Sequence, residues 1–290
     1  MLPKRTIGLF TRYSQPKTII KKAFISTETF MSSNSRLKNK TVFITGATSG
    51  IGLACAWNYA RAGAHLVLSG RRADKLEEIS AQLKESVPGT QVYTKPLDVR
   101  DKVQVDSFVH QLPQQFKNVD ILVNNAGLVL GLEPLEKISE ADMDTMLNTN
   151  VKGLVFCTQA LLPSLRKTGG HIVNIGSIAG LEAYKNGSIY CASKHAVKAI
   201  TQSLRCELLD SNVKITVIDP GMVETEFSLI RFRGDADKAA AVYAGIDPLK
   251  SQDIAEIVVF ATSRPKHVEI SNLTVYPHGQ ASATQIHRKQ

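Results

Sequence analysis

The stretch SIYCASKHAV, residues 188–197, brings a tyrosine, a lysine and a histidine close together. Tyr190 and Lys194 are four residues apart, so on a helix they lie on one face, whereas His195 points elsewhere. A phenol beside an ammonium group can donate or accept a proton. The alternative is an ordinary amphipathic helix with two polar residues near its start, and only the rest of the chain can decide between them.

Such a pair is suited to proton transfer at a carbonyl or alcohol oxygen. A free tyrosine has a pKa of about 10, which is too high for a base near neutrality. At about 4 Å and an effective dielectric constant near 20, a lysine ammonium favours the phenolate by about 4 kcal/mol before desolvation. Because one pKa unit corresponds to about 1.4 kcal/mol, we expect Lys194 to lower the pKa of Tyr190 by about two units, towards the range of efficient acid–base catalysis.

The elements that position this pair are visible as short apolar runs alternating with longer helical patterns. Most of the runs are apolar throughout, as strands buried on both faces should be. The alternation predicts an α/β fold, a doubly wound Rossmann-type parallel sheet in a single domain over residues 36–290. The strands are expected at 41–45, 65–69, 91–97, 120–124, 171–176, 214–219 and 273–277, with helical segments such as 73–86 and 104–116 between them.

Composition is typical of a soluble globular protein, with 43% hydrophobic and 21% charged residues. No apolar run is long enough for a transmembrane helix. The four cysteines lack the paired spacing of a metal site and are interpreted as reduced thiols of an intracellular protein. The net charge of +9 gives no indication of nucleic-acid binding, because over half of it lies in the first 35 residues and the body has no basic–aromatic pattern.

The N-terminal segment, residues 1–35, is expected to lie outside the fold. It contains six basic residues and one acid, Glu28, and alternates basic with apolar side chains, as a mitochondrial transit peptide does. The alternatives are a disordered tail or an overlong gene model with a start at Met31. The protein is therefore expected in mitochondria if the segment is a working transit peptide and in the cytoplasm otherwise.

In a parallel sheet, ligands bind beyond the carboxyl ends of the strands, and a glycine-rich loop follows the first strand. TGATSGIG, residues 45–52, precedes a helical pattern, so that its glycines allow a tight turn and the helix N-terminus offers free N–H groups to a phosphate. The spacing of Gly46, Gly50 and Gly52 resembles the TGxxxGxG pattern of the short-chain dehydrogenase/reductase family. That resemblance implies dinucleotide contacts from the loop, including Ser49 and Ile51.

The end of the second strand distinguishes between cofactors. An acid there would bind the ribose 2′-hydroxyl of NAD, whereas basic residues accommodate the 2′-phosphate of NADP. The chain has no acid at this point and continues with Arg71 and Arg72, whose planar guanidinium groups suit a phosphate. The alternative is that they are solvated residues at a strand end. NADP is the expected cofactor.

Other strand ends extend the resemblance. Asp98 and Val99 match the pair that contacts adenine in the family, and Asn125 belongs to NNAG, a motif that shapes the backbone beside the cofactor. After the sixth strand, Pro220, Val223 and Thr225 fit the family's PGxxxT, where the carboxamide is held. A plain Pro-Gly turn is the alternative for this last motif.

The Tyr190–Lys194 pair now becomes part of a set that matches the family's Asn–Ser–Tyr–Lys tetrad in residue type and spacing. The resemblance implies that Tyr190 donates or accepts the proton and that Ser177 hydrogen-bonds the substrate oxygen. Lys194 would lower the pKa of Tyr190 and bind the nicotinamide ribose, and Asn150 would hold a water in a proton relay. Asn148 is an alternative for the last role. His195 is expected to pack or lie at the surface, and no metal is implied.

Longer phrases such as GHIVNIGSIAG and PGMVETEFSLIRFRGD resemble the branch of NADP-dependent 3-hydroxy acid dehydrogenases that includes L-allo-threonine and serine dehydrogenases. The branch implies short 3-hydroxy acids of the serine or 3-hydroxyisobutyrate type as substrates and a homotetramer. From the charge distribution and the lack of a long apolar run, no nucleic-acid partner and no membrane insertion are expected. Arg231 and Arg233, in the variable substrate lid, could meet a substrate carboxylate or serve as surface or oligomer contacts. Two other functions stay open: a reductase of bulkier carbonyls (steroid, retinoid or acyl-thioester) and a non-catalytic NADP-sensing protein.

Overall fold

The computed structural model describes residues 36–289. The segment 1–35, interpreted above as a transit peptide, lies outside the described residues, so that interpretation and the localisation that depends on it stay predictions. Residues 36–289 form one α/β unit, which confirms the expected fold class.

The core is a seven-stranded sheet in the order β3-β2-β1-β4-β5-β6-β9, with every neighbouring pair parallel. The order reverses between β1 and β4, and such a switch point opens a crevice at the carboxyl ends of the strands. Each expected strand is present to within two residues at either end. The strands are Thr41–Thr45 (β1), His65–Gly70 (β2), Val92–Pro96 (β3), Ile121–Asn124 (β4), His171–Ile175 (β5), Lys214–Pro220 (β6) and Asn272–Val275 (β9).

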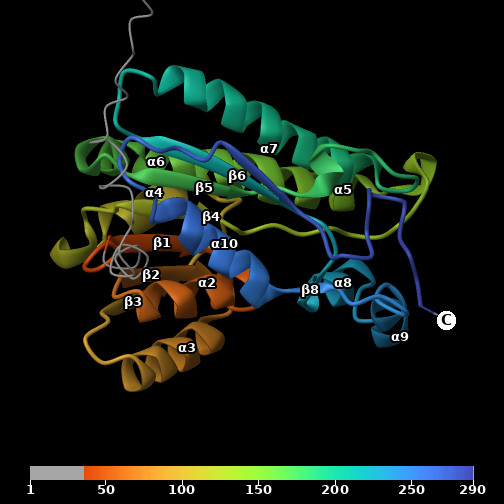
Figure 1. Cartoon of the computed structure of the whole chain (residues 1–290), viewed down its shortest axis with the longest axis horizontal. Coiled ribbons are helices and arrows are strands. Elements are labelled where there is room, and N and C mark those ends of the chain that lie inside the picture. Colours follow the sequence, from red (N-terminus) through yellow and green to blue (C-terminus); the bar gives the residue numbers. More distant parts are fainter. Residues whose placement is uncertain (1–35, 290) are drawn as a thin grey trace, which may run out of the picture. The chain divides into compact units, whose positions relative to one another are not determined.

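Side-chain alternation in these strands divides the core into two layers. Val42 and Ile44 of β1 join a cluster on one face of the sheet, whereas Phe43 between them joins a cluster on the other face. Helices Gly50–Arg61 (α2), Ala73–Ser86 (α3) and Ser251–Thr262 (α10) cover the first face. Lys102–His110 (α4) and Leu154–Thr168 (α6) cover the second, where Glu140–Leu147 (α5) and Ser188–Glu207 (α7) also pack against each other (Figure 1).

The local sequence explains where several helices begin and end. The α3 helix has the expected bounds, and its Leu76, Ile79 and Leu83 are buried at helical spacing. The segment 104–116 is helical only as far as His110 in α4, because Pro113 lacks an N–H and leads instead into a short 3₁₀ turn. None of the helices in residues 36–289 is long and apolar enough to cross a membrane.

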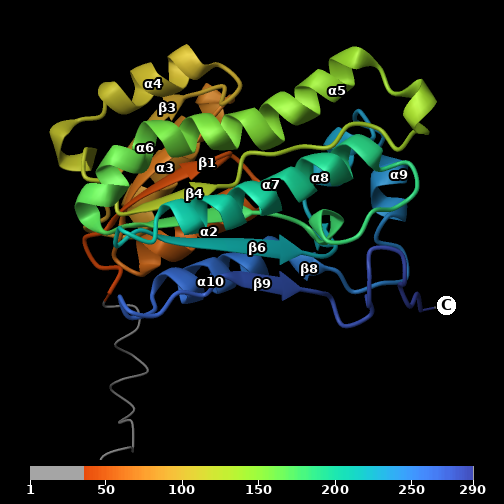
Figure 2. The same cartoon turned by 90° about the horizontal axis from the view of Figure 1, so that it is seen from above.

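A small group of elements lies beyond the carboxyl ends of β5 and β6. It comprises the strand pair Val223–Glu224 (β7) and Leu249–Lys250 (β8) and the short helices Glu226–Arg231 (α8) and Ala236–Ala241 (α9). Figure 2 shows the C-terminal stretch running from β9 to the neighbourhood of α9. This group of elements, called the lid below, and the C-terminal stretch therefore lie over the strand ends, where a site is expected.

Candidate active site

A cavity of about 970 Å³ opens at the carboxyl ends of the strands. It is lined by residues from every strand end that the sequence analysis selected, from the lid elements and from the C-terminal stretch. The site residues expected from the sequence that line it are Gly46, Ser49, Gly50, Ile51, Arg71, Arg72, Asp98, Val99, Asn125, Ser177, Tyr190, Lys194, Pro220, Val223, Thr225 and Arg231.

The glycine loop has the close backbone packing that its sequence predicts. Gly46 and Gly50 have φ of +64° and +56°, values that favour glycine. A Cβ at Gly52 would lie 2.4 Å from the Gly46 carbonyl oxygen, so no side chain fits there. The Asn125 amide donates to the carbonyls of Thr45 (2.9 Å) and Gly46 (3.1 Å) and so fixes the loop from the neighbouring strand.

The first turn of α2 presents the free donors that a phosphate needs. Ser49 is the N-cap residue, yet its hydroxyl makes no capping hydrogen bond. No acid lies in the first turn of the helix, so nothing there repels an anion. The loop can therefore bind a pyrophosphate through backbone N–H groups and the Ser49 hydroxyl.

The two arginines after β2 have different surroundings. Arg72 donates to the carbonyl oxygen (3.2 Å) and hydroxyl (3.0 Å) of Thr48 and pairs with Glu226 on α8 at 3.1 Å. Arg71 lines the cavity and forms no ion pair with any of the described residues. Arg71 therefore presents a free guanidinium where a 2′-phosphate would lie, and Arg72 joins this corner to the lid.

Asp98 and Val99 shape the same end of the cavity. The Asp98 carboxylate accepts a hydrogen bond from Arg100 Nε at 2.9 Å, and this bond, helped by the nearby Arg71, holds its pKa below the usual value. Val99 is buried, and a Cβ at Gly153 would lie 2.6 Å from its Cγ2. Asp98 is thus ionised at neutral pH and Val99 is fixed by close packing.

Ser177, Tyr190 and Lys194 meet in the cavity as the sequence spacing predicts. Ser177 follows β5, and its hydroxyl accepts a hydrogen bond from the Ala179 N–H at 3.1 Å. Tyr190 and Lys194 lie in the first turns of α7 and are each 7% exposed. Lys194 Nζ donates to the Ile175 carbonyl at 2.9 Å and lies 5.9 Å from the centre of the Tyr190 ring.

The expected lowering of the Tyr190 pKa by Lys194 is not present in this state of the protein. Burial raises the pKa of Tyr190 above its ordinary value, and a hydrogen bond with Ser177 and the charge of Arg231 oppose this rise only in part. Burial also lowers the pKa of Lys194 to about 8, while Asp219 opposes that change. Desolvation therefore has the largest effect on the pKa of both groups, and it outweighs the attraction between an ammonium and a phenolate that was expected from the spacing.

Asn150, rather than Asn148, has its side chain in the buried network beside the site. It lies in a π-helical turn, Asn148–Gly153 (η4), a distortion often found at functional sites. Its amide donates to the Leu128 carbonyl and to Ser193 Oγ, and its Oδ1 accepts from the Leu128 N–H at 2.8 Å. These contacts fix the backbone after β4, and the role of Asn150 in a proton relay stays a prediction.

The substrate end of the cavity is formed by Arg231 and two tyrosines. Arg231 donates to the Tyr184 hydroxyl, and its guanidinium lies 5.8 Å from the Tyr184 ring and 6.0 Å from the Tyr190 ring. Its Nε is buried and has no hydrogen-bond partner among residues 36–289. Arg233, in contrast, lies outside the cavity lining and pairs with Asp142 at 2.6 Å, so for Arg233 the structure agrees with the surface-contact alternative.

His195 also lies outside the cavity lining. Its Nδ1 is 2.9 Å from the Cys191 carbonyl oxygen, one turn earlier on α7. This contact agrees with the packing role expected for it.

Several lining residues were missed by the sequence analysis. Tyr184 and Lys185 lie between Ser177 and Tyr190, where the chain must pass the site, and this position was the available signal. Gln280 and Arg288 come from the C-terminal stretch, for which the sequence offered no motif. Gln280 Oε1 accepts from the Met222 N–H at 2.9 Å, and Arg288 donates to the carbonyls of Val242 and Ala244 beside α9.

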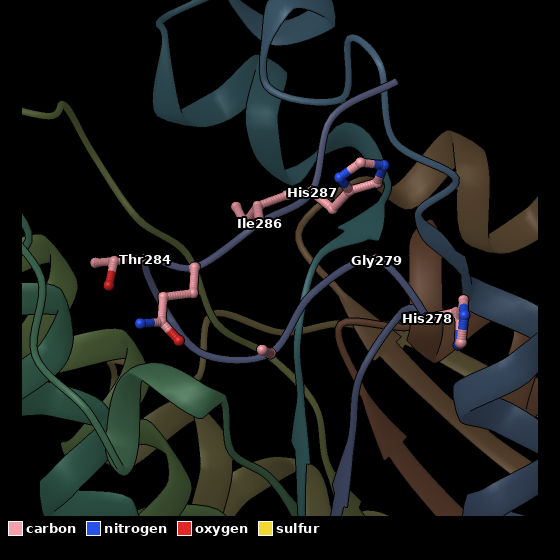
Figure 3. A pocket seen from close by; sticks show the side chains of 7 residues that line it. His278, Gly279, Thr284, Ile286 and His287 are labelled. Carbon is pink, nitrogen blue, oxygen red and sulfur yellow. The ribbon is translucent and has the colours of Figure 1, made fainter. Parts of the chain in front are cut away.

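The C-terminal stretch also lines a smaller, shallow hollow of about 560 Å³ that is open to solvent (Figure 3). Figure 3 shows His278, Gly279, Thr284, Ile286 and His287 around it. Thr284 and Ile286 line the main cavity as well. The stretch is therefore folded back on itself as one wall of the active site.

A family model for short chain dehydrogenases matches residues 40–232. The chain therefore belongs to the short chain dehydrogenase family, which confirms the resemblance found in its motifs. It is 43% identical to the NADP-dependent 3-hydroxy acid dehydrogenase of Schizosaccharomyces pombe over 88% of this chain and 99% of the relative. It is 45% identical to sulfoacetaldehyde reductase 2 of Chromohalobacter salexigens over 83% of this chain and 95% of the relative.

Among solved structures, the closed form of a serine dehydrogenase complexed with NADP+ matches with a TM-score of 0.80 and 40% identity. The match covers 86% of this chain and 100% of that one. The likeness thus extends over the lid elements and is not confined to the dinucleotide-binding half.

Proposed function

We propose that the protein is an NADP-dependent dehydrogenase that interconverts short 3-hydroxy acids and the corresponding 3-oxo acids. The observation that carries this proposal is the position of Arg231, whose guanidinium lies 6.0 Å from the Tyr190 ring and whose buried Nε has no partner in the described part of the chain. A substrate whose hydroxyl meets Tyr190 would place a carboxylate a few bonds away on Arg231. An arginine pairs with a carboxylate through two parallel hydrogen bonds, which fixes the substrate's orientation.

The cofactor site fits NADP. The loop around Ser49 would hold the pyrophosphate, Arg71 and Arg72 the 2′-phosphate, and the backbone near Val223 with Thr225 the carboxamide. When bound, the nicotinamide supplies the acceptor or donor of hydride. The relatives and the solved neighbour that are named for NADP support this choice.

The protein's own residues manage the proton. Ser177 would hold the substrate oxygen beside the Tyr190 hydroxyl, which protonates a carbonyl being reduced or takes the proton from an alcohol being oxidised. Because burial raises the pKa of Tyr190, the phenol is neutral near pH 7 and is ready to donate a proton to a carbonyl. Oxidation needs the phenolate, which the positive charge of Arg231 and the hydrogen bond from Ser177 would stabilise.

A second candidate is the reduction of a short aldehyde that carries a sulfonate. A guanidinium binds sulfonate as well as carboxylate oxygens, and the relatives from Chromohalobacter salexigens, at 45% and 46% identity, are named sulfoacetaldehyde reductases. The two candidates share the cofactor, the proton donor and the anion site. They differ in the anion that Arg231 would bind and in the carbon skeleton between that anion and the reacting oxygen.

The test is the turnover of purified protein on a panel of substrates. Formation of NADPH from NADP+ with serine, L-allo-threonine and 3-hydroxyisobutyrate is compared with oxidation of NADPH by sulfoacetaldehyde and by a steroid ketone. We expect turnover on 3-hydroxy acids and a strong preference for NADP+ over NAD+. Turnover of steroid ketone alone, or of no substrate, contradicts the proposal.

The proposal extends to a homotetramer, on the family resemblance given above. The exposed Phe260 on α10 and the open edge of β9 support assembly, because apolar side chains and unpaired strand edges tend to be covered. Light scattering of the purified protein measures the mass directly, and a monomer contradicts this part of the proposal.

A further inference from the structure

A buried carboxylate, that of Asp219, is hydrogen-bonded to the backbone of Ser177. Asp219, near the end of β6, is 1% exposed. Its Oδ1 accepts a hydrogen bond from the Ser177 backbone N–H at 3.2 Å, and its Oδ2 accepts from Lys198 Nζ and Asn272 Nδ2, both at 2.6 Å. Asp219 therefore connects the loop after β5, the helix α7 and the edge strand β9.

The fit between Asp219 and this loop is close. A Cβ at Gly176 would lie 2.0 Å from Asp219 Oδ1, so only glycine allows the carboxylate to reach the Ser177 N–H. The Ser177 side chain is held in turn by the Ala179 N–H. The Asp219 carboxylate thus fixes the backbone of Ser177, and the Ala179 N–H fixes the Ser177 hydroxyl.

The charge of Asp219 requires an explanation, because a buried carboxylate is costly unless it is paired and hydrogen-bonded. Lys198 supplies the pair, with the lysine side chain 18% exposed. Asp219 also acts on Lys194, one turn before Lys198 on α7: burial lowers the pKa of Lys194, and the charge of Asp219 opposes that fall. Burial raises the pKa of Tyr276 beyond β9, and the charges of Glu182 and Asp219 add to that rise.

We propose that Asp219 and Lys198 are positioning residues for the catalytic set: the carboxylate holds the Ser177 backbone in place and puts a negative charge on the short loop whose Ile175 carbonyl accepts a hydrogen bond from Lys194, while Lys198 holds the carboxylate. The proposal rests on the proposed function, since it assigns Ser177 and Lys194 the roles given there. Neither Asp219 nor Lys198 touches substrate or cofactor in this account.

The test uses Asp219→Asn and Lys198→Met, which remove opposite charges from one ion pair. Glu269→Gln is the matched control, because Glu269 also forms an ion pair with α7, through Arg205 at 2.7 Å, but outside the cavity lining. For each variant, kcat and KM are measured from pH 6 to 10 on the best substrate of the wild type, and thermal unfolding confirms the fold.

For Asp219→Asn we expect a fall in kcat of about 10²-fold, the size of effect seen when a catalytic group is slightly misplaced. We also expect the alkaline limb of the kcat profile to move to lower pH, because Lys194 loses the negative neighbour that opposes the fall in its pKa. Lys198→Met lowers kcat without moving the limb downwards, Lys198→Arg recovers most of the loss, and the control variant behaves like the wild type.

A purely structural role gives a different pattern. The proposal is overturned if both variants lose kcat while the alkaline limb of their kcat profiles stays at the wild-type pH. It is also overturned if Asp219→Asn keeps full kcat. Should Asp219→Asn fail to fold, Lys198→Met decides, since a wild-type kcat in that variant also overturns it. Failure of the proposed function is separate: it shows in the wild type, as an absence of turnover on 3-hydroxy acids, before any variant is compared.

Discussion

Replacement of Arg231 by methionine tests the proposed recognition of a substrate anion. Methionine keeps much of the side-chain volume and removes the charge and the donors. Arg231 donates to Tyr184, and its buried Nε has no acceptor among the residues that the structure describes. If a carboxylate binds there, the variant loses a charged hydrogen-bonded pair at the substrate end of the cavity.

The magnitude follows from the kind of contact. A hydrogen bond to a charged group contributes about 1.5–3 kcal/mol, which corresponds to about 10- to 150-fold in kcat/KM. Arg231 also lowers the pKa of Tyr190, so its loss slows every substrate to some extent. The informative quantity is therefore the ratio of kcat/KM for an acid to that for its neutral analogue, in which this common effect cancels.

The assay compares 3-hydroxybutyrate with 3-hydroxybutyramide, in which a neutral amide replaces the carboxylate and the rest of the molecule is the same. We expect Arg231→Met to lower the acid-to-amide ratio by about 10- to 150-fold. Arg233→Met is the matched control, because its 57% exposed side chain pairs with Asp142 outside the cavity, where an ion pair contributes about 0–1 kcal/mol. An unchanged ratio in Arg231→Met, or an equal fall in Arg233→Met, refutes the reasoning.

Three further predictions concern other parts of the site. Arg71→Ala is expected to lower the preference for NADP+ over NAD+ by about 10- to 150-fold, because the Arg71 guanidinium lines the cavity and would pair there with the 2′-phosphate that NAD+ lacks, and steady-state kinetics with both cofactors measure this. Lys194→Met is expected to unfold at a higher temperature than the wild type at pH 7, because burial lowers the pKa of Lys194 from 10.5 to about 8 and so makes its charged form costly in the folded state. This cost is fully present below pH 8 and disappears as the pH rises towards 10.5. The difference in melting temperature between variant and wild type should therefore vanish over that pH range. Arg288→Ala is expected to raise the substrate KM about tenfold with little change in NADP+ affinity, because it releases the C-terminal stretch from the lid carbonyls of Val242 and Ala244; a parallel loss of cofactor affinity, measured by fluorescence titration, contradicts that assignment.

Much of the site could be inferred from the sequence because a parallel sheet brings its strand ends to one edge. Ser177, Tyr190 and Lys194 come from two elements, yet the order of strands and helices alone requires them to meet. The glycine loop could also be predicted from the sequence, because there is no space for a Cβ at Gly52 and the position must therefore be glycine.

Other features depend on tertiary packing that no local pattern records. The pKa of Tyr190 is set mainly by burial, which a spacing of four residues cannot reveal. Arg231 and Arg233 are two residues apart and chemically identical, but one turns into the cavity and the other to Asp142. The C-terminal stretch reaches the lid through Arg288, and a contact across 44 residues leaves no periodic signal.

The measurement that tests the central claim most directly is NADP+-dependent oxidation of a short 3-hydroxy acid by the wild type and by Tyr190→Phe, with cofactor affinity measured in parallel. The account predicts that the variant binds NADPH like the wild type and loses kcat by about 10²- to 10⁴-fold, the contribution expected of a general acid–base. A variant that keeps its kcat on the same substrate would contradict the assignment of Tyr190 as the proton donor and acceptor.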